Sequence, residues 1–75
     1  MEKLIGNRLR QERMERRLTQ TEVAVMAGVS RPYYADVEMG RYTPSLKLLV
    51  KLSVIFDIDL NFLKENVGNT SNVGA

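Results

Sequence analysis

The stretch TQTEVAVMAGVSRPYYADVE, residues 19–38, predicts two short helices separated by a single glycine. Thr19 followed three residues later by Glu22 has the pattern of a capping box, in which each side chain accepts the other residue's backbone N–H. Gly28 suits the left-handed conformation at which many helices end. Ser30 is a typical N-cap for a second helix. The apolar residues of the first helix fall on one face at helical spacing: Val23, Ala24 and Ala27.

The second of these helices separates inward from outward residues. Tyr34 and Val37 face the core, and Val29 fills the corner between the two helices. The residues left pointing outward are Arg31, Pro32, Tyr33 and Asp36. In a helix-turn-helix motif, outward side chains of the second helix contact base edges in the major groove. The stretch is therefore a candidate helix-turn-helix.

Length and composition limit the classes to which the chain can belong. Its 75 residues suit one small domain. It has no cysteine and no histidine, so the usual catalytic and metal-binding sets are missing, and we expect no enzyme, no cofactor and no metal. Asp57 and Asp59 fit a loop and a helix cap better than a catalytic pair. The longest apolar run, near residues 52–56, is too short for a membrane span, and the N-terminus resembles no signal peptide. We expect a cytoplasmic protein with no membrane partner.

The net charge is only +2, but arginine is concentrated near the N-terminus. Those arginines are Arg8, Arg10, Arg13, Arg16 and Arg17. The acidic residues that partly cancel them are Glu2, Glu12 and Glu15. Two interpretations remain open: a basic surface for nucleic acid, or a solvated helix face with i,i+4 pairs such as Glu12 with Arg16.

One arginine in the first helix, expected from Lys3 to about Arg16, faces inward. Ile5 and Leu9 form the inward row of this helix, and Arg13 continues the row. A charge in that position persists only when it is paired and hydrogen-bonded. We therefore assign Glu38 as its partner, with the alternative that both side chains are exposed.

Two further helices are expected after the helix-turn-helix. Gly40 and Pro44 end the preceding helix in a loop, and Ser45 caps a helix that runs to about Phe56. Its expected inward stripe is Leu46, Leu49, Leu52, Ser53 and Phe56. Asp59 caps a last short helix, residues 60 to about 65. We expect one all-α domain over residues 1–65 and a flexible tail over residues 66–75.

Apolar residues are more abundant between residues 46 and 63 than one buried helix face requires. Leu48 and Ile55 lie off the expected inward stripe. Together with Leu60 or Phe62, they either broaden the core or form a patch that a second copy covers. We expect a homodimer with its interface at Leu48, Ile55, Leu60 and Phe62.

Several sequence segments, taken in order, resemble the five-helix, lambda-repressor-like DNA-binding domain of phage repressor and Cro proteins and of XRE-type regulators. These segments are Leu18-Thr19-Gln20 with Glu22, Ala27-Gly28-Val29-Ser30 preceded by Ala24, Val37-Glu38 with Gly40, Pro44-Ser45-Leu46, and Ile58-Asp59-Leu60-Asn61-Phe62-Leu63. The resemblance extends from Ile5 to about Leu63. It implies a compact all-α fold with the helix-turn-helix at the second and third helices.

The resemblance also implies roles for individual residues. Arg13 and Glu38 match a structural ion pair, and the last helix with the end of the fourth matches a dimer contact. The positions that match base-reading residues are Ser30, Arg31, Pro32, Tyr33 and Asp36. The positions that match phosphate contacts are Gln20, Arg41, Tyr42 and Thr43. Arg10 and Arg8 either add phosphate contacts or only solvate the first helix.

Three residues depart from the family pattern. Arg17 stands where the family mostly has glycine, which predicts a non-glycine residue at positive φ. Pro32 cannot donate a hydrogen bond to a base, although its ring can touch a thymine methyl group. Asp36 is repelled by phosphates unless it accepts a hydrogen bond from cytosine or orients Arg31. We expect Asp36 to orient Arg31.

The main hypothesis is a sequence-specific regulator that binds double-stranded DNA as a homodimer on an inverted-repeat operator. As a bare domain, it would repress by covering a promoter, activate by contacting RNA polymerase, or do both according to site position. The alternative is a protein-interaction module, such as an antitoxin or antirepressor, with its partner site around Leu48 and Ile55. The modest charge, Pro32 and Asp36 favour the alternative, whereas Gln20, Arg31 and the loop at residues 41–43 oppose it.

Overall fold

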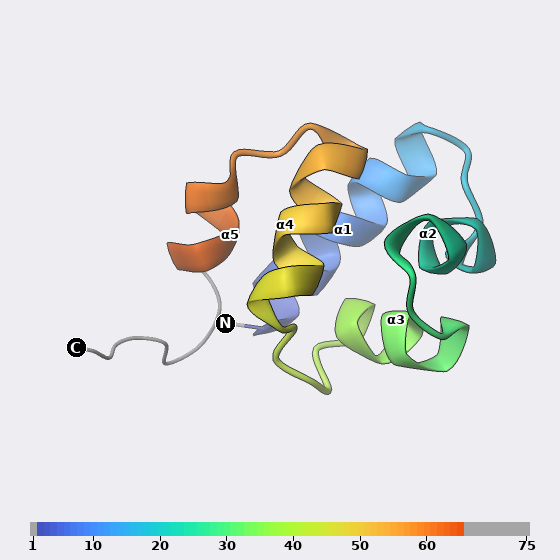
Figure 1. Ribbon diagram of the computed structural model, residues 1–75, viewed down its shortest axis with the longest axis horizontal. Helices are drawn as coiled ribbons and strands as arrows, with labels where there is room; N and C mark the ends of the chain where they lie inside the picture. Colours follow the sequence, from blue (N-terminus) through green and yellow to red (C-terminus); the bar gives the residue numbers. More distant parts are fainter. Residues whose placement is uncertain (1, 66–75) are drawn as a thin grey trace.

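A computed structural model describes residues 2–65, which form five helices (Figure 1). The helices are α1 (Glu2–Glu15), α2 (Gln20–Ala27), α3 (Arg31–Glu38), α4 (Leu46–Phe56) and α5 (Leu60–Glu65). The prediction of an all-α, five-helix domain with the helix-turn-helix at α2 and α3 is confirmed. The flexible tail expected at residues 66–75 lies outside the described residues.

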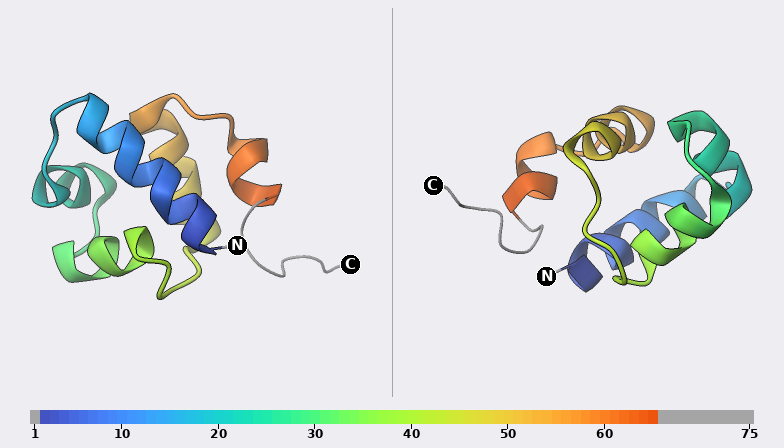
Figure 2. Two further views of the ribbon diagram at one scale, coloured as in Figure 1. Left: turned by 180° about the vertical axis from the view of Figure 1, so that it is seen from behind. Right: turned by 60° about the horizontal axis from the view of Figure 1, so that its bottom comes forward.

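Helices α1 and α4 form the centre of the molecule. Helices α2 and α3 lie on one side of this pair and α5 lies on the other, as the front and rear views both show (Figures 1 and 2). Helix α3 contacts α1 and α2, while α4 contacts α1, α2 and α5. The buried apolar side chains between them make one core: Ile5, Leu9, Val23, Ala24, Ala27, Tyr34, Val37, Leu48, Leu49, Leu52, Phe56, Ile58 and Leu63.

Local capping interactions set the ends of α2 and the start of α3. The Thr19 Oγ1 atom accepts the Glu22 N–H at 3.0 Å, and Glu22 Oε1 accepts the Thr19 N–H at 2.8 Å. Gly28 ends α2 with φ of 72°. Ser30 Oγ then accepts the Tyr33 N–H at 3.2 Å. The predicted capping box, left-handed glycine and N-cap are all confirmed, so the turn between α2 and α3 is specified locally.

Three other residues with positive φ shape the connections. Arg17 has φ of 56°, as predicted from its place where the family mostly has glycine. Gly40, which follows α3, has φ of 79°. Asp57 caps the C-terminus of α4 with φ of 52°, and Asp59 Oδ1 accepts the Asn61 N–H at 2.9 Å. Both aspartates therefore have the structural roles expected from the sequence.

The predicted inward face of α4 was wrong in its first turn. Leu48 is only 2% exposed, whereas Leu46 is 60% exposed. Leu48, Leu52 and Phe56 are spaced four residues apart and so share the face that meets the core. Leu46 points away from that face because it lies six residues before Leu52. Leu48 is therefore a core residue, and its assignment to an exposed dimer interface was wrong.

Gly6 allows α1 to approach α3 at backbone distance. A Cβ atom built at Gly6 would lie 2.1 Å from the carbonyl oxygen of Glu38 and 2.7 Å from its carbonyl carbon. Backbone atoms cannot rotate away from such a contact, so only glycine fits at this crossing. Nothing in the sequence predicts this role for Gly6, since a lone glycine in a helix gives no indication of what packs against it.

Candidate nucleic-acid interface

A buried ion pair joins the end of α3 to α1. Arg13 Nε lies 2.7 Å from Glu38 Oε2, and Arg13 Nη2 lies 3.2 Å from Glu38 Oε1. The Glu38 side chain is only 2% exposed and that of Arg13 is 13% exposed. Gln20 Nε2 also donates to Glu38 Oε1, at 3.1 Å. One carboxylate thus connects α1, the start of α2 and the end of α3.

The protonation of this cluster follows from its hydrogen bonds. Burial alone would raise the pKa of Glu38, but hydrogen bonds from Arg13 and Gln20 outweigh burial and lower the pKa below its ordinary value. For Tyr34, burial and then the neighbouring Glu38 carboxylate raise the pKa well above its ordinary value. The buried Tyr34 hydroxyl lies beside the pair without a hydrogen bond of good geometry. Glu38 is therefore ionised at neutral pH, and α3 is held in place by charge-assisted bonds.

Gln20 lies at the start of α2, and its side chain and backbone amide have different partners. Its side chain is half-buried and committed to Glu38. Its backbone N–H begins α2, where an α-helix leaves its first amides without an intrahelical partner. Such an N-terminus attracts anions. The backbone amide is therefore the group of Gln20 best placed for a phosphate, while one side-chain N–H is used to hold the helix in position.

The outward face of α3 begins with three exposed residues, Ser30, Arg31 and Pro32. Pro32 lies in the first turn, where its missing N–H breaks no hydrogen bond. Among residues 2–65, Arg31 has no ion pair or hydrogen bond to another side chain. Its guanidinium is therefore free to bind an external group.

Among the described side chains, Asp36 pairs with Arg41 and forms no ion pair with Arg31, contrary to our expectation. Its Oδ1 atom lies 3.3 Å from Arg41 Nη1 in the loop after α3. The Arg41 backbone N–H also donates to the Asp36 carbonyl oxygen at 2.9 Å. The loop folds back because Gly40 adopts positive φ, and this return brings residue 41 over the last turn of the helix.

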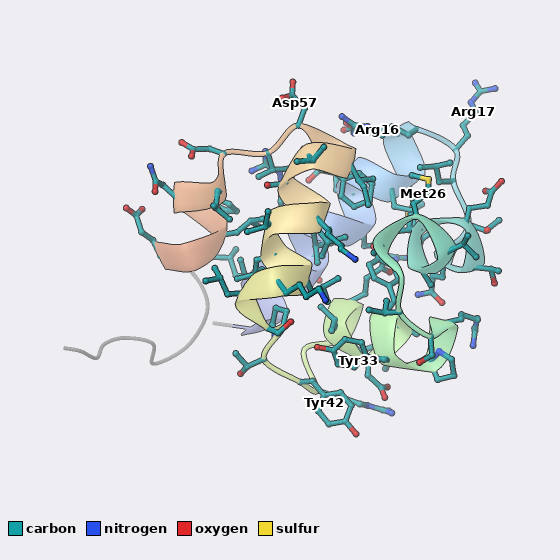
Figure 3. The ribbon with its side chains drawn as sticks, in the orientation of Figure 1. Arg16, Arg17, Met26, Tyr33, Tyr42 and Asp57 are labelled. Atoms are coloured by element: carbon teal, nitrogen blue, oxygen red, sulfur yellow. The ribbon has the colours of Figure 1, made fainter. Side chains whose placement is uncertain are left out.

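Tyr33 and Tyr42 make a second contact between α3 and the loop. Their ring centroids lie 6.0 Å apart with planes inclined by 32°, and both rings lie at the same end of the molecule (Figure 3). Tyr33 is half-buried, whereas the Tyr42 side chain is mostly exposed. Aromatic pairs at this separation attract each other. The exposed loop residues Arg41, Tyr42 and Thr43 are thus fixed beside the outward face of α3.

Within residues 2–65, the arginines of α1 and of the turn that follows it divide into those with a partner and those without one. Arg8 Nε lies 2.8 Å from Glu12 Oε2 and its guanidinium lies 5.0 Å from the Phe62 ring centre. Arg16 Nη1 lies 2.6 Å from Glu12 Oε1, and Arg16 Nη2 donates to the Phe56 carbonyl oxygen at 2.9 Å. Arg10 is exposed, beside a shallow depression on α1. Arg8 and Arg16 therefore fit the interpretation of a helix face with i,i+4 ion pairs. Arg10 remains available for a phosphate.

The remaining residues of the expected dimer surface are partly accessible. Ile55, Leu60 and Phe62 are half-buried and pack against the core. Helix α4 also exposes an apolar stripe that the sequence analysis did not identify: Leu46, Val50 and Val54. These residues recur every four positions on the solvent side of α4. On α4, the apolar surface open to another protein is therefore formed by Leu46, Val50 and Val54, and Leu48 is not part of it.

Within residues 2–65, no three acidic side chains gather closely enough to hold a metal ion, and the chain has no histidine or cysteine to add to them. No helix in this part of the chain has the length and apolar character needed to cross a membrane.

Comparison with known proteins identifies the family. A helix-turn-helix family model matches residues 9–63. The chain is 44% identical over 62 residues to the ImmF control region 10 kDa protein of Bacillus phage phi105, covering 83% of this chain and 69% of that protein. It is 49% identical over 45 residues to the immunity repressor protein of the same phage, covering 60% of this chain and 31% of that protein.

A bacterial relative extends the match. The chain is 32% identical over 72 residues to the HTH-type transcriptional regulator SinR of Bacillus subtilis, covering 95% of this chain and 65% of that protein. The chain thus spans less than two thirds of the phage immunity repressor and of SinR. No solved structure matches it significantly. The matched model and relatives, together with the observed helix-turn-helix, show that the chain belongs to the XRE-type helix-turn-helix family of DNA-binding transcriptional regulators.

Proposed function

We propose that this protein binds a specific inverted-repeat DNA site as a homodimer and represses transcription from the promoter that contains the site. The observation that carries the proposal is the free Arg31 guanidinium at the start of α3, on a helix whose other end is fixed by the buried Arg13–Glu38 pair. A specific contact needs both features, since a reading side chain discriminates bases only when its helix is held rigidly.

Arg31 would read a guanine. A guanidinium can bond the O6 and N7 atoms of guanine together, which discriminates against a wrong base by about 1–3 kcal/mol. Ser30 and Pro32 lie beside it and are also exposed. The Ser30 hydroxyl can still donate a hydrogen bond, because its oxygen only accepts the Tyr33 N–H. The Pro32 ring suits a thymine methyl group.

Phosphate contacts would set the position of α3 in the groove. The Gln20 backbone amide would bind a phosphate on one side of the groove, and the loop at residues 41–43 would bind one on the other. This loop is exposed and held against α3 by the Tyr33–Tyr42 contact. Arg10, also exposed, would add a further phosphate contact. Such contacts carry affinity without sequence information.

Two copies related by a two-fold axis would place their α3 helices in successive major grooves, roughly 34 Å apart. We propose that Ile55, Leu60 and Phe62 contribute to the dimer contact. The name of one relative, an immunity repressor protein, supports repression. A site beside rather than within a promoter would instead allow contact with RNA polymerase.

A protein-interaction module is the weaker proposal. Its expected partner site consists of Leu48 and Ile55. Leu48 is buried in the core, so half of that site is inaccessible. The exposed stripe of α4 does not support the interaction module, because nothing among the described residues indicates which partner would cover it.

Selection from a random DNA library with the purified protein tests the main proposal. We expect enrichment of an inverted repeat with half-sites about one helical turn apart. In binding assays with the enriched site, Arg31→Ala should abolish preference at one base pair per half-site, a loss of about 1–3 kcal/mol. Arg41→Ala should weaken all sequences and flatten the salt dependence by about one unit. Failure to enrich any sequence at low salt would refute sequence-specific binding.

The dimer contact predicts that Ile55→Glu lowers self-association, because a carboxylate in an apolar interface must be desolvated. Sedimentation velocity would show a shift toward monomer, and circular dichroism would show that the variant remains folded. Val54→Glu is the matched control, since Val54 is 76% exposed on the same helix. If Val54→Glu dissociates the dimer and Ile55→Glu does not, the interface lies on the outer stripe of α4 instead.

A further inference from the structure

We infer that Asp36 reads no base but limits the affinity of the protein for DNA of every sequence, by holding and neutralising Arg41. This inference rests on the proposed function. It assigns Asp36 to positioning and charge balance, in contrast to the base contact implied by its place on α3.

The geometry ties the Asp36 carboxylate to the loop. Arg41 Nη1 lies 3.3 Å from Asp36 Oδ1, and the backbone N–H of Arg41 is bonded to the Asp36 carbonyl oxygen. The Asp36 side chain is 27% exposed, whereas that of Arg41 is 63% exposed. The carboxylate thus lies partly covered by the loop, while Arg41 reaches out into solvent beside it.

The neighbouring aromatic pair keeps this arrangement in place. Tyr33 lies three residues before Asp36, and its contact with Tyr42 holds the loop residue next to Arg41 against α3. Figure 3 shows both tyrosines together at the end of the molecule where α3 meets the loop. The loop therefore cannot swing away from Asp36 without breaking the aromatic contact as well.

The ion pair between Asp36 and Arg41 is too weak to block DNA binding, but its charges affect how binding depends on salt. An exposed ion pair of this kind is weak, so it does not prevent Arg41 from turning toward a phosphate. The carboxylate nevertheless stays beside the phosphate that Arg41 binds. Each phosphate that a protein cation neutralises contributes about 0.9 to the slope of log affinity against log salt. Arg41 and Asp36 together have no net charge, so the pair as a whole should contribute little of this slope.

Arg41, which is paired with Asp36, thus differs from Arg31, which has no ion pair among the described residues. The base-reading cation keeps its full charge, and the phosphate-binding cation is partly cancelled. Removing the Asp36 charge should therefore strengthen binding equally on all sequences, because Arg41 contacts no base in the proposed complex.

The test compares Asp36→Asn with Asp57→Asn. Both substitutions remove one negative charge, so the variants have equal net charge. Asp57 is exposed and lies at the opposite end of the molecule from Tyr33 and Tyr42 (Figure 3). Asparagine is well tolerated at its positive φ. Fluorescence anisotropy would measure binding of each variant to labelled duplexes, both random-sequence and library-selected, over a range of salt concentrations.

For Asp36→Asn we expect a slope steeper by about 0.9 units and an affinity about eight-fold higher at 0.1 M salt, with the same gain on both duplexes. Asp57→Asn should change neither value appreciably. The double variant Asp36→Asn with Arg41→Ala, which lacks both charges, should return to the wild-type slope.

Three results would overturn the inference. Loss of preference at a single base pair in Asp36→Asn would show that Asp36 reads a base. Weaker binding to all duplexes would show that the carboxylate supports the bound loop. Equal gains in Asp36→Asn and Asp57→Asn would show only an effect of net charge. Failure of the wild-type protein to bind any duplex at low salt would refute the proposed function itself, and is distinct from all three.

Discussion

Replacing Gly6 with alanine is expected to destabilise the domain by about 3 kcal/mol, as a side chain forced into a closely packed contact does. The added Cβ would lie 2.1 Å from the Glu38 carbonyl oxygen and 2.8 Å from that of Val37. To relieve this overlap, α1 and α3 must separate. The loss is a large fraction of the stability of a small domain.

The same separation would disturb the ion pair. Glu38 meets α1 twice, through its backbone at Gly6 and through its carboxylate at Arg13. Moving the helices apart lengthens the hydrogen bonds between Arg13 and Glu38, whose lengths are 2.7 and 3.2 Å. We therefore expect Gly6→Ala to reduce DNA binding as well, since the end of α3 would lose its anchor.

Urea denaturation followed by circular dichroism measures this effect. Asn7→Ala is the matched control, because Asn7 is exposed in the same turn of α1. Alanine is the better helix former, so the control should be stabilised by up to about 0.5 kcal/mol. Alanine at position 6 would bring a similar or larger gain if the space were open. A Gly6→Ala protein as stable as the control would contradict the close approach of α1 and α3.

Replacing Glu38 with alanine should be the second most damaging change, with a loss of about 2–4 kcal/mol in the free energy of unfolding. Breaking a buried ion pair leaves the other charge uncompensated, which costs about 3–5 kcal/mol when burial is complete. The Arg13 side chain retains 13% exposure, which reduces the penalty. Gln20 would also lose the acceptor that positions it at the start of α2.

Glu12→Ala is the matched control for Glu38→Ala. Glu12 likewise pairs with arginine, at 2.8 Å to Arg8 and 2.6 Å to Arg16, but these two arginines are 37% and 36% exposed. Surface pairs of this kind contribute about 0–1 kcal/mol. Because the bond lengths are similar and the burial differs, Glu38→Ala should lower the free energy of unfolding more than Glu12→Ala. Thermal or urea unfolding would measure both losses. Equal losses in both would contradict this explanation.

The pKa of Glu38 gives this pair a pH signature. Burial opposes ionisation, but the hydrogen bonds from Arg13 and Gln20 lower the folded-state pKa below the ordinary value of 4.5. A group whose pKa falls on folding stabilises the protein above its unfolded pKa, and this stabilisation is lost as pH falls through the folded value. The wild type should therefore lose stability from about pH 5 downward. Glu38→Gln should show a shallower loss over the same range in urea titrations at successive pH values.

Much of the fold follows from local sequence signals. Thr19, Glu22, Gly28 and Ser30 act through atoms within a few residues of themselves, so their pattern alone predicts where α2 ends and α3 begins. Arg17 could be placed at positive φ from the family resemblance, and the angle of 56° agrees. The partnership of Arg13 with Glu38 was also predictable, because an inward charge requires an opposite one.

The face of a helix is less well determined by sequence. In α4 nearly every residue that is not charged is apolar, so several stripes satisfy the helical period. Packing of α1, α2 and α5 around α4 selected the face that carries Leu48 and left Leu46 exposed. The predicted dimer surface failed at Leu48 for the same reason.

What the sequence by itself determined is the set of caps, turns and helices, and with them the family, because those signals act over a few residues. Only the tertiary structure decided that Gly6 lies against the Glu38 backbone and that Asp36 pairs with Arg41 rather than Arg31. The first contact joins segments far apart in the chain. The second depends on the path of the loop after Gly40, where a single positive φ redirects the chain and selects which arginine the carboxylate meets.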